Sequence, residues 1–117
     1  METYAVVRTE HLNHNGTLFG GQLLLWVDEY AWMAASLDFP GKKLVTRAMD
    51  TVEFKYSAHS GSILRFDITQ KLLGTTSVKY HVDVFADEVG ASKEKIIFSN
   101  CVTFVAVGKD GKKTPLK

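Results

Sequence analysis

The residue in this sequence with the strongest potential for chemistry is Asp28, a carboxylate within an apolar segment. Residues 20–37 favour one helix, along which Gln22, Glu29 and Ser36 recur every seven residues as a polar stripe. Asp28 lies about 100° around the helix axis from Glu29, and its neighbours three and four residues away are apolar. Removal of a carboxylate from water raises its pKa and makes it a stronger base near neutral pH. Asp28 is therefore a candidate catalytic base.

A structural role for Asp28 is the alternative. An ionised carboxylate among apolar groups is costly unless a cation or hydrogen-bond donors compensate it. Pairing of Asp28 with Arg47, or with a backbone group, would meet that need without any catalysis. The spacing by itself does not decide between the two roles.

The glycine pair Gly20-Gly21 at the start of the same segment is a second candidate. A helix N-terminus exposes unpaired N–H groups and carries partial positive charge, and glycine lets a ligand carbonyl approach the backbone closely. Such a site can stabilise an oxyanion. The alternative, which Gly-Gly alone favours, is a tight loop or close packing. Asp28 follows the helix start by about 10 Å along the axis, too far for both to touch one atom within a subunit. The spacing therefore predicts an active site at a dimer interface.

The bulk composition fits one soluble domain spanning residues 1–117. Hydrophobic residues make up 45% and charged residues 23% of the chain, which argues against disorder. The net charge of +1 gives no field that would recruit nucleic acid or an anionic membrane surface.

The cysteine count and the apolar segments favour a cytoplasmic location. Cys101 is the single cysteine and cannot form an intramolecular disulfide, which is typical of a reducing compartment. The first residues lack the basic start and apolar run of a signal peptide. The longest apolar stretch, residues 23–35, contains two acidic residues and is too short to insert into a bilayer.

The elements around the helix are predicted to be strands of one antiparallel sheet. A short first strand is expected at Val6 and Val7, and four extended runs follow. These runs are residues 44–57, 62–73, 76–86 and 95–107. Apolar residues alternate along them, which indicates one buried face. The faces comprise Leu64, Phe66, Ile68 and Leu72 in one run, Val78, Tyr80, Val82 and Val84 in the next, and Ile96, Phe98, Val102, Phe104 and Ala106 in the last. We expect an α+β fold in which the sheet wraps around the helix and a second subunit covers the remainder.

Residues 11–21 (HLNHNGTLFGG), followed by WVD at residues 26–28, closely resemble the hot-dog acyl-CoA thioesterases. The resemblance is to the bacterial broad-specificity short-chain type and the brain acyl-CoA hydrolase type. Further matches run from LVT at residues 44–46 to Phe54, and at GTTSV (residues 74–78) and TFVAV (residues 103–107). The resemblance implies a hot-dog fold, with about five strands around one long central helix.

The same resemblance implies roles for five residues in acyl-CoA hydrolysis. Asp28 would be the catalytic carboxylate, as a general base on water or as a nucleophile. Backbone N–H groups near Gly20 and Gly21 would polarise the thioester carbonyl. Thr46 would lie near the catalytic water, and Asn13 would order the loop before the helix. The protein would be active as a homodimer or a higher homo-oligomer, a tetramer or a hexamer.

Seven residues are expected to contact the substrate. They comprise Phe19, Phe54, Lys55, Gly74, Thr75, Thr76 and Ser77. Lysines near the CoA phosphates, among them Lys71, Lys112 and Lys113, are further candidates, although an ordinary charged surface is the alternative for each. Leu24, Leu25, Trp32 or Phe54 would line an acyl tunnel or belong to the core. No cofactor or metal is expected, because thioesters are reactive acyl donors and CoA is part of the substrate.

Two departures from the family pattern are visible. His11 stands where relatives usually have aspartate, and Thr17 stands where they often have Asn or Asp to assist the carboxylate from the partner subunit. A non-catalytic acyl-CoA sensor is therefore one alternative. A hot-dog hydratase or dehydratase is another, although the loop before the helix lacks the prolines and histidine of that motif. Cys101 is expected to be a packed residue, because no histidine lies near it in sequence, and His81 is expected to be solvated.

Overall fold

The apolar segment forms helix α1, Gly20–Asp38, in a computed structural model that describes residues 1–117. Alanines and leucines favour the helix, and Pro40 and Gly41, with a φ of 82° at Gly41, turn the chain after it. A 3-10 turn, η1 (Thr9–His11), precedes α1. The predicted helix of residues 20–37 is confirmed.

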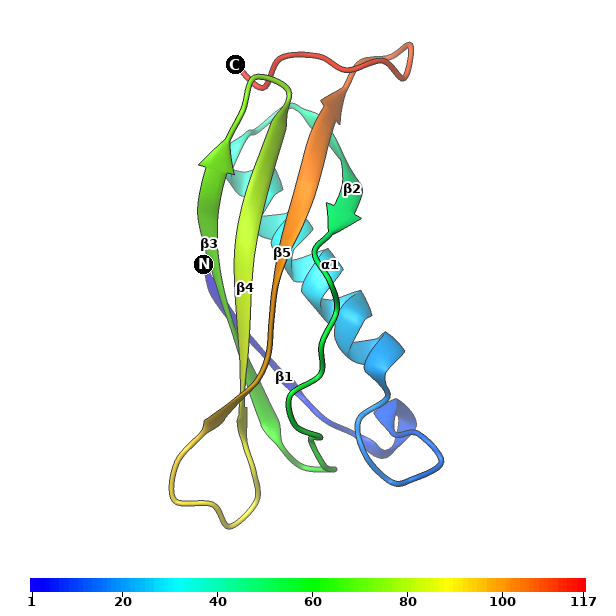
Figure 1. Cartoon of the computed structure of the whole chain (residues 1–117), viewed down its shortest axis with the longest axis vertical. Helices are drawn as coiled ribbons and strands as arrows, with labels where there is room; N and C mark the ends of the chain where they lie inside the picture. The colour runs from blue at the N-terminus through cyan, green and yellow to red at the C-terminus, as the bar shows by residue number, and fades with distance from the viewer.

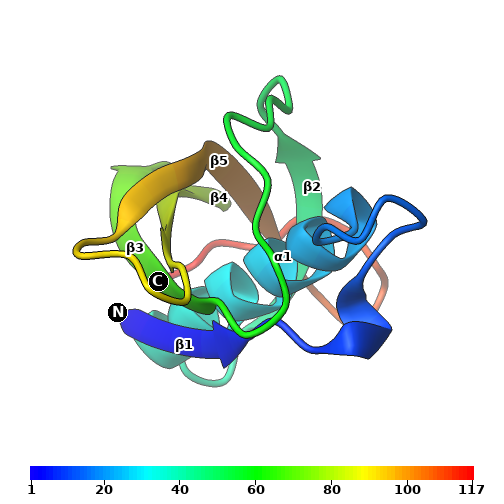
Figure 2. The same ribbon diagram turned by 90° about the horizontal axis from the view of Figure 1, so that it is seen from below.

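Five strands form one antiparallel sheet beside α1 (Figure 1). They are β1 (Glu2–Val6), β2 (Lys43–Met49), β3 (Ile63–Leu73), β4 (Ser77–Asp87) and β5 (Lys95–Val107). The strand order is β1-β3-β4-β5-β2, so β1 and β2 are the edges. Figure 2 shows α1 on the concave side of the sheet, between these two edges. This is the expected arrangement of a long helix wrapped by an antiparallel sheet.

The core fills the space between the concave face of the sheet and one side of α1. Strand β4 shows the alternation most clearly, because every second side chain from Val78 to Ala86 is buried. The helix contributes a matching buried stripe, which comprises Leu23, Trp26, Val27, Ala31, Ala34 and Ala35. Trp26 and Tyr30 both meet the ring of Phe66 edge-on, at centroid distances of 6.3 and 4.9 Å.

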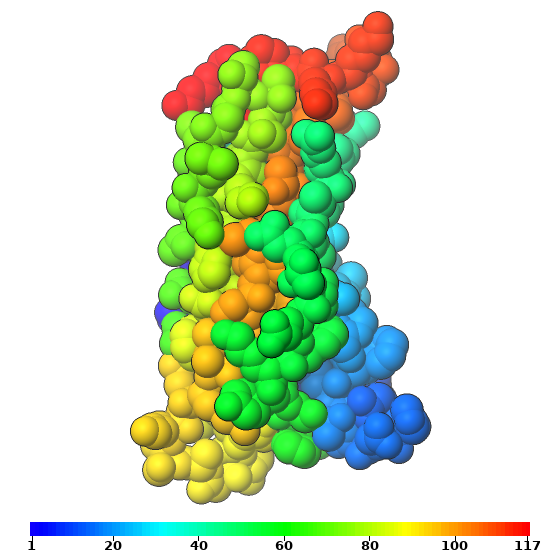
Figure 3. Space-filling view, in the orientation of Figure 1, coloured from blue at the N-terminus to red at the C-terminus, as the bar shows by residue number.

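The predicted long strand over residues 44–57 is only half confirmed. Strand β2 ends at Met49, and residues 51–58 continue as an extended segment with a single bridge between Phe54 and Phe98. Its side chains before Ala58 are exposed, so the β-forming residues there do not belong to a ladder. In Figure 3 this segment, in green, lies between α1 and β5 on the viewed face.

Two apolar residues depart from the predicted buried faces. Leu72 is 65% exposed, because the register between β3 and β4 shifts between Gln70 and Leu72. Ile96 is only half-buried, next to a register shift between β4 and β5. The remaining predicted face residues of these strands are buried.

One side of α1 stays uncovered by the sheet. Leu25, Trp32 and Met33 are all exposed, and Leu25 and Trp32 lie next to β2. Leu37 is 74% exposed too, but it lies beside Ile68 and Gln70 of β3. The outer edge of β2 also has no neighbouring strand. An apolar helix face beside a free strand edge is a surface that other chains can cover. None of the helices combines the length and apolarity needed to cross a membrane.

Candidate active site

Asp28 lies in the middle of α1, and its carboxylate is bound by β2. The hydroxyl of Thr46 donates a hydrogen bond to Asp28 Oδ1 at 2.6 Å. Asp28 is half-buried, whereas Thr46 is exposed in the single chain. The resemblance placed Thr46 near the catalytic water, and the structure brings it into contact with Asp28, 18 positions away in the sequence.

A shallow concavity of about 390 Å³ surrounds this pair. It is lined by Leu25, Asp28, Glu29, Trp32, Leu44, Val45 and Thr46. Trp32 donates from Nε1 to the carbonyl of Leu44 at 3.1 Å, which fixes α1 against β2 at this point. The apolar surroundings expected for Asp28 are present, but Glu29 lines the same concavity.

The alternative pairing of Asp28 with Arg47 does not occur, since Asp28 forms no ion pair within the chain. Arg47 instead stands outside the ladder between β2 and β5. Thr46 pairs with Phe104 and Ala48 pairs with Thr103, so Arg47 is the extra residue of a bulge.

Asn13 organises the loop before α1. Its Oδ1 accepts from the backbone N–H of Asn15 at 2.9 Å and of Thr17 at 3.2 Å, and its Nδ2 donates to the Thr17 hydroxyl at 3.1 Å. Gly16 adopts a φ of 79°, which suits the turn. Asn13 therefore has the loop-ordering contacts predicted for it. Thr17, which differs from the residue usual in the family, takes part in these contacts.

His11, the second residue that differs from the family pattern, packs against the helix. Its ring meets Trp26 edge-on at a centroid distance of 4.8 Å, and Nδ1 accepts from the N–H of Arg8 at 3.0 Å. These contacts give His11 a structural role beneath the loop.

Gly20 and Gly21 begin α1, and their N–H groups have no acceptor within the chain. A Cβ at Gly20 would meet the ring of Phe54 at 3.0 Å, and one at Gly21 would meet the ring of Phe19 at 2.6 Å. Close packing of two aromatic rings thus accounts for the glycines. The backbone N–H groups at the helix start still remain unpaired within the chain. The glycine pair can therefore serve both close packing and the binding of an oxyanion.

A cavity of about 380 Å³ opens beside the helix start. Its lining includes the predicted residues Asn13, Phe19, Gly20 and Phe54. It also includes Thr17, which the sequence analysis singled out as a departure from the family pattern, and residues that it did not propose as site residues, namely His14, Leu18, Leu23, Tyr56, Ser57, Ala58 and Ile97. Tyr56 and Ser57 were missed because they were assigned to the strand predicted over residues 44–57.

The Asp28 concavity and this cavity share no lining residue. Gly20 precedes Asp28 by eight helical residues, about 12 Å along the axis. One chain therefore does not bring the glycine N–H groups and the carboxylate to one reacting atom, as the spacing predicted.

The turn from Gly74 to Ser77 lies at the opposite end of the molecule from the start of α1 (Figure 1). The N–H of Gly74 donates to the carbonyl of Ser77 at 2.8 Å, and Thr75 and Thr76 accept from the C-terminal part of the chain. Within one chain, Gly74, Thr75, Thr76 and Ser77 are thus separated from Phe19 and Phe54. The expected substrate contacts therefore do not meet within one protomer, and an interface between subunits is needed to bring them together.

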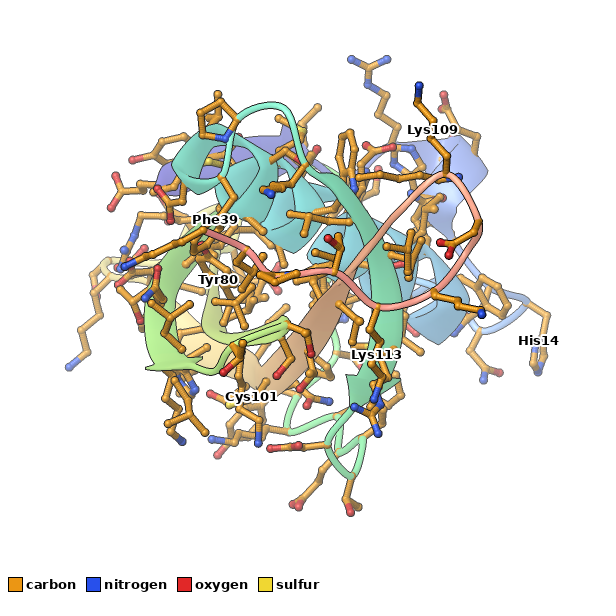
Figure 4. The ribbon with its side chains drawn as sticks, turned by 90° about the horizontal axis from the view of Figure 1, so that it is seen from above. His14, Phe39, Tyr80, Cys101, Lys109 and Lys113 are labelled. Atoms are coloured by element: carbon orange, nitrogen blue, oxygen red, sulfur yellow. The ribbon has the colours of Figure 1, made fainter.

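The predicted lysines are also divided. The backbone of Lys55 donates to the carbonyl of Ile97 at 3.0 Å, near the helix-start cavity. Lys71 lies on β3 with its ammonium near Cys101. Lys113 forms a backbone bridge with Val107, the last residue of β5, at the other end of the molecule (Figure 4).

A hydrogen bond between a buried phenol and an exposed carboxylate also joins α1 to the sheet, away from these cavities. The phenol of Tyr80, which is 1% exposed, donates to Asp38 Oδ2 at 2.6 Å. Burial and then this hydrogen bond raise the pKa of Tyr80 well above its usual range. The phenol consequently stays protonated and anchors the C-terminal end of α1.

Comparison with known proteins identifies the family. The thioesterase superfamily model matches residues 15–92. The uncharacterized acyl-CoA thioester hydrolase YkhA of Bacillus subtilis is 28% identical over 99% of this chain. The chain spans 66% of that relative, slightly less than two thirds of its length.

Solved structures give the same result. A hexameric acyl-CoA thioesterase in the apo form is 30% identical and superposes with a TM-score of 0.89 over 98% of this chain and 73% of its own. The acyl-CoA hydrolase of Staphylococcus aureus, in complex with butyryl-CoA, CoA and CoA disulfide, is 30% identical, with a TM-score of 0.87 over 98% of this chain and 70% of its own. Structures of its alanine variants at an asparagine, an aspartate and a threonine are also known. The chain has the hot-dog fold and belongs to the thioesterase superfamily.

Proposed function

We propose that this protein hydrolyses acyl-CoA thioesters to free CoA and a carboxylic acid, with Asp28 as the catalytic carboxylate. The observation that carries the proposal is the Asp28 side chain, half-buried in an open concavity and oriented by the Thr46 hydroxyl at 2.6 Å. A carboxylate fixed in this way has one oxygen bound and its second oxygen available for a water molecule or a thioester.

The chemistry needs a base and a site for negative charge. As a base, Asp28 takes a proton from water while the water oxygen attacks the thioester carbonyl. The carbonyl oxygen becomes negative, and free N–H groups at the start of a helix stabilise it. Collapse of the intermediate breaks the carbon–sulfur bond and releases CoA, which takes up a proton. Attack by Asp28 itself, followed by hydrolysis of the anhydride, gives the same products. Neither route requires a metal or a cofactor.

The active site would form between two copies of the chain. Gly20 and Asp28 are too far apart within one protomer, and the exposed apolar face of α1 lies beside the free edge of β2. A two-fold contact of this face would place the helix start of one protomer near the carboxylate of its partner. The Gly74–Ser77 turn would also approach from the partner. The hexameric relative supports a homodimer or a higher homo-oligomer.

The Staphylococcus aureus variants support the choice of residues. The asparagine replaced in that protein lies 15 positions before the replaced aspartate, as Asn13 lies before Asp28. The replaced threonine follows that aspartate by 17 positions, one fewer than Thr46 follows Asp28. Its complexes with butyryl-CoA and CoA support an acyl-CoA substrate here. The cavity at Phe19 and Phe54 is a suitable place for apolar parts of that substrate.

Release of free thiol from acyl-CoAs of several chain lengths tests the proposal. We expect Asp28→Asn to lower kcat by a factor on the order of a hundred or more, the loss typical of a positioned base. Glu29→Gln is the matched control, because Glu29 lines the same concavity and should keep most of the activity. Size-exclusion chromatography must show the same oligomer for both variants.

A non-catalytic acyl-CoA sensor is the alternative outcome of this experiment. Binding of CoA by the wild type without turnover of any acyl-CoA would establish it. Equal activity of wild type and Asp28→Asn would instead show that thioesters are cleaved elsewhere. The cytoplasmic location is a further proposal, which fractionation of cells would test.

A further inference from the structure

A cluster of reactive side chains lies on the outer face of the sheet, apart from the proposed active site. Cys101 on β5 stands directly opposite His81 on β4, and its Sγ lies 3.5 Å from His81 Nδ1. Figure 4 shows Cys101 on the side of β5 that faces away from α1. Cys101 is buried, as expected for a packed residue, but it also has a histidine partner, which comes from the neighbouring strand and not from nearby in the sequence.

The other side of the His81 ring is held by Asp83. His81 Nε2 lies 2.9 Å from Asp83 Oδ1, which also accepts from the Ser99 hydroxyl at 2.6 Å. A carboxylate only accepts, so Nε2 must carry a hydrogen and donate it. The neutral ring then presents its lone pair at Nδ1 to the thiol. Asp83 thus orients His81 as a proton acceptor for Cys101, which is the arrangement of an activated nucleophile.

A cation completes the surroundings of the sulfur. The ammonium of Lys71 approaches Cys101 Sγ at 3.8 Å from β3. Nearby cations favour the thiolate form of cysteine. Transfer of the thiol proton to His81 would leave a thiolate between an imidazolium and an ammonium group.

Access to the sulfur is narrow. Cys101 is 4% exposed, and the side chains of His81 and Lys71 lie against its sulfur. The His81 side chain is 35% exposed, so the cover is a single layer at the surface. A small reagent reaches such a sulfur more easily than a thioester or a disulfide that carries a large group.

We propose that Cys101 is a site of oxidation by small hydroperoxides. The thiolate attacks the terminal oxygen of the hydroperoxide, the sulfur–oxygen bond forms and the oxygen–oxygen bond breaks. The departing alkoxide or hydroxide takes the proton that His81 received from the thiol. Sulfur is oxidised by two electrons to a sulfenic acid, and the hydroperoxide is reduced to an alcohol or to water. The modification lies on the outer face of the sheet and does not depend on the proposed hydrolysis.

Trapping of the sulfenic acid tests the proposal. The purified protein is treated with hydrogen peroxide and a 1,3-diketone trap, and adduct formation is followed by intact mass spectrometry. Cys101 is the single cysteine, so a cysteine adduct has one possible position. The folded wild type should react faster than the same chain unfolded in urea, and Cys101→Ser should give no adduct.

Variants of the cluster test whether His81 and Asp83 activate the Cys101 thiol or whether the thiol reacts only because it is accessible. His81→Gln should slow the reaction about tenfold or more, because a free thiol is only a few per cent ionised near pH 7. Asp83→Asn should slow it as well, and His59→Gln, a histidine outside the cluster, should not change it. Thermal unfolding must show the same stability for these variants as for the wild type, so that a slower reaction reports loss of the base and not a loosened fold. Glutathione disulfide should react more slowly than peroxide.

Three results would overturn the proposal. The first is a folded wild type that reacts no faster than the unfolded chain. The second is an unchanged rate in both His81→Gln and Asp83→Asn. The third is faster modification by glutathione disulfide than by hydrogen peroxide, which would contradict the selection of a small oxidant.

Discussion

The hydrogen bond from Thr46 to Asp28 predicts the effect of a single isosteric change. Thr46→Val replaces the hydroxyl by a methyl group and removes the one side-chain donor that the chain provides to this carboxylate. Hydrogen bonds to charged groups contribute about 1.5–3 kcal/mol. Thr46 is exposed and Asp28 is half-buried in the single chain, so we use the low end, about 1.5 kcal/mol. That free energy corresponds to about a tenfold loss of rate.

The loss should appear in kcat rather than in KM, because the contact orients the carboxylate and does not bind the acyl chain. Release of free thiol from a short acyl-CoA, measured with a chromogenic disulfide, gives both constants. Thr46→Ser is the matched control, since it keeps the hydroxyl and should retain activity within about threefold of the wild type.

Two results would contradict this reasoning. If Thr46→Val kept or exceeded the wild-type kcat, the hydroxyl would have no orienting role. If Thr46→Ser lost as much activity as Thr46→Val, packing of the γ-methyl group in β2, rather than the hydrogen bond, would explain the loss. Circular dichroism and the oligomer size should be unchanged in both variants, because an exposed side chain carries little of the fold.

Three further predictions concern the assembly and the fold. Mixed oligomers of Asp28→Asn and Asn13→Ala should recover about a quarter of the wild-type activity if each site takes these two residues from different protomers. Half of randomly mixed dimers contain both variants, and one of the two sites in such a dimer is intact. No recovery would indicate a site within one chain. Phe66→Ala, at a fully buried position, should lower the free energy of unfolding in urea by about 3–5 kcal/mol, and a change under about 1 kcal/mol would contradict the described core. Because the pKa of Tyr80 is raised in the folded protein, the phenol ionises first in the unfolded chain as the pH rises. The stabilisation by this phenol is therefore present below about pH 10 and declines above it. Between about pH 8 and about pH 11, the free energy of unfolding in urea should fall more in the wild type than in Tyr80→Phe, and an equal fall would refute the assignment.

Local patterns were sufficient to predict most of the fold. The alanine-rich apolar segment gave α1, and alternation gave β3, β4 and β5 with nearly correct bounds. The pattern failed where residues 50–57 have strand-forming side chains but no strand partner. Val52, Phe54 and Tyr56 are exposed there, and Phe54 packs over Gly20 instead. The β-propensity of a residue indicates a preference for extended backbone, but it does not show that a neighbouring strand is present to pair with.

The candidate site was predictable only in part. Asp28 is visible from the sequence because it departs from the polar stripe of its helix. Thr46 is not, since nothing periodic sets β2 against α1, and its position followed from the family resemblance alone. The pair of His81 and Cys101 was missed for a similar reason. Both strands were recognised, but only the cross-strand register brings the two side chains together.

The bulge in β2 makes the strand respond to changes in length in two different ways. Loss of Arg47 would leave every remaining pair between β2 and β5 in place and simply straighten the strand. Loss of a residue between Lys43 and Thr46 would instead turn the threonine hydroxyl to the far side of the sheet. Harmless and disabling deletions therefore lie within three positions of each other, a boundary that a scan of substitutions alone would not reveal.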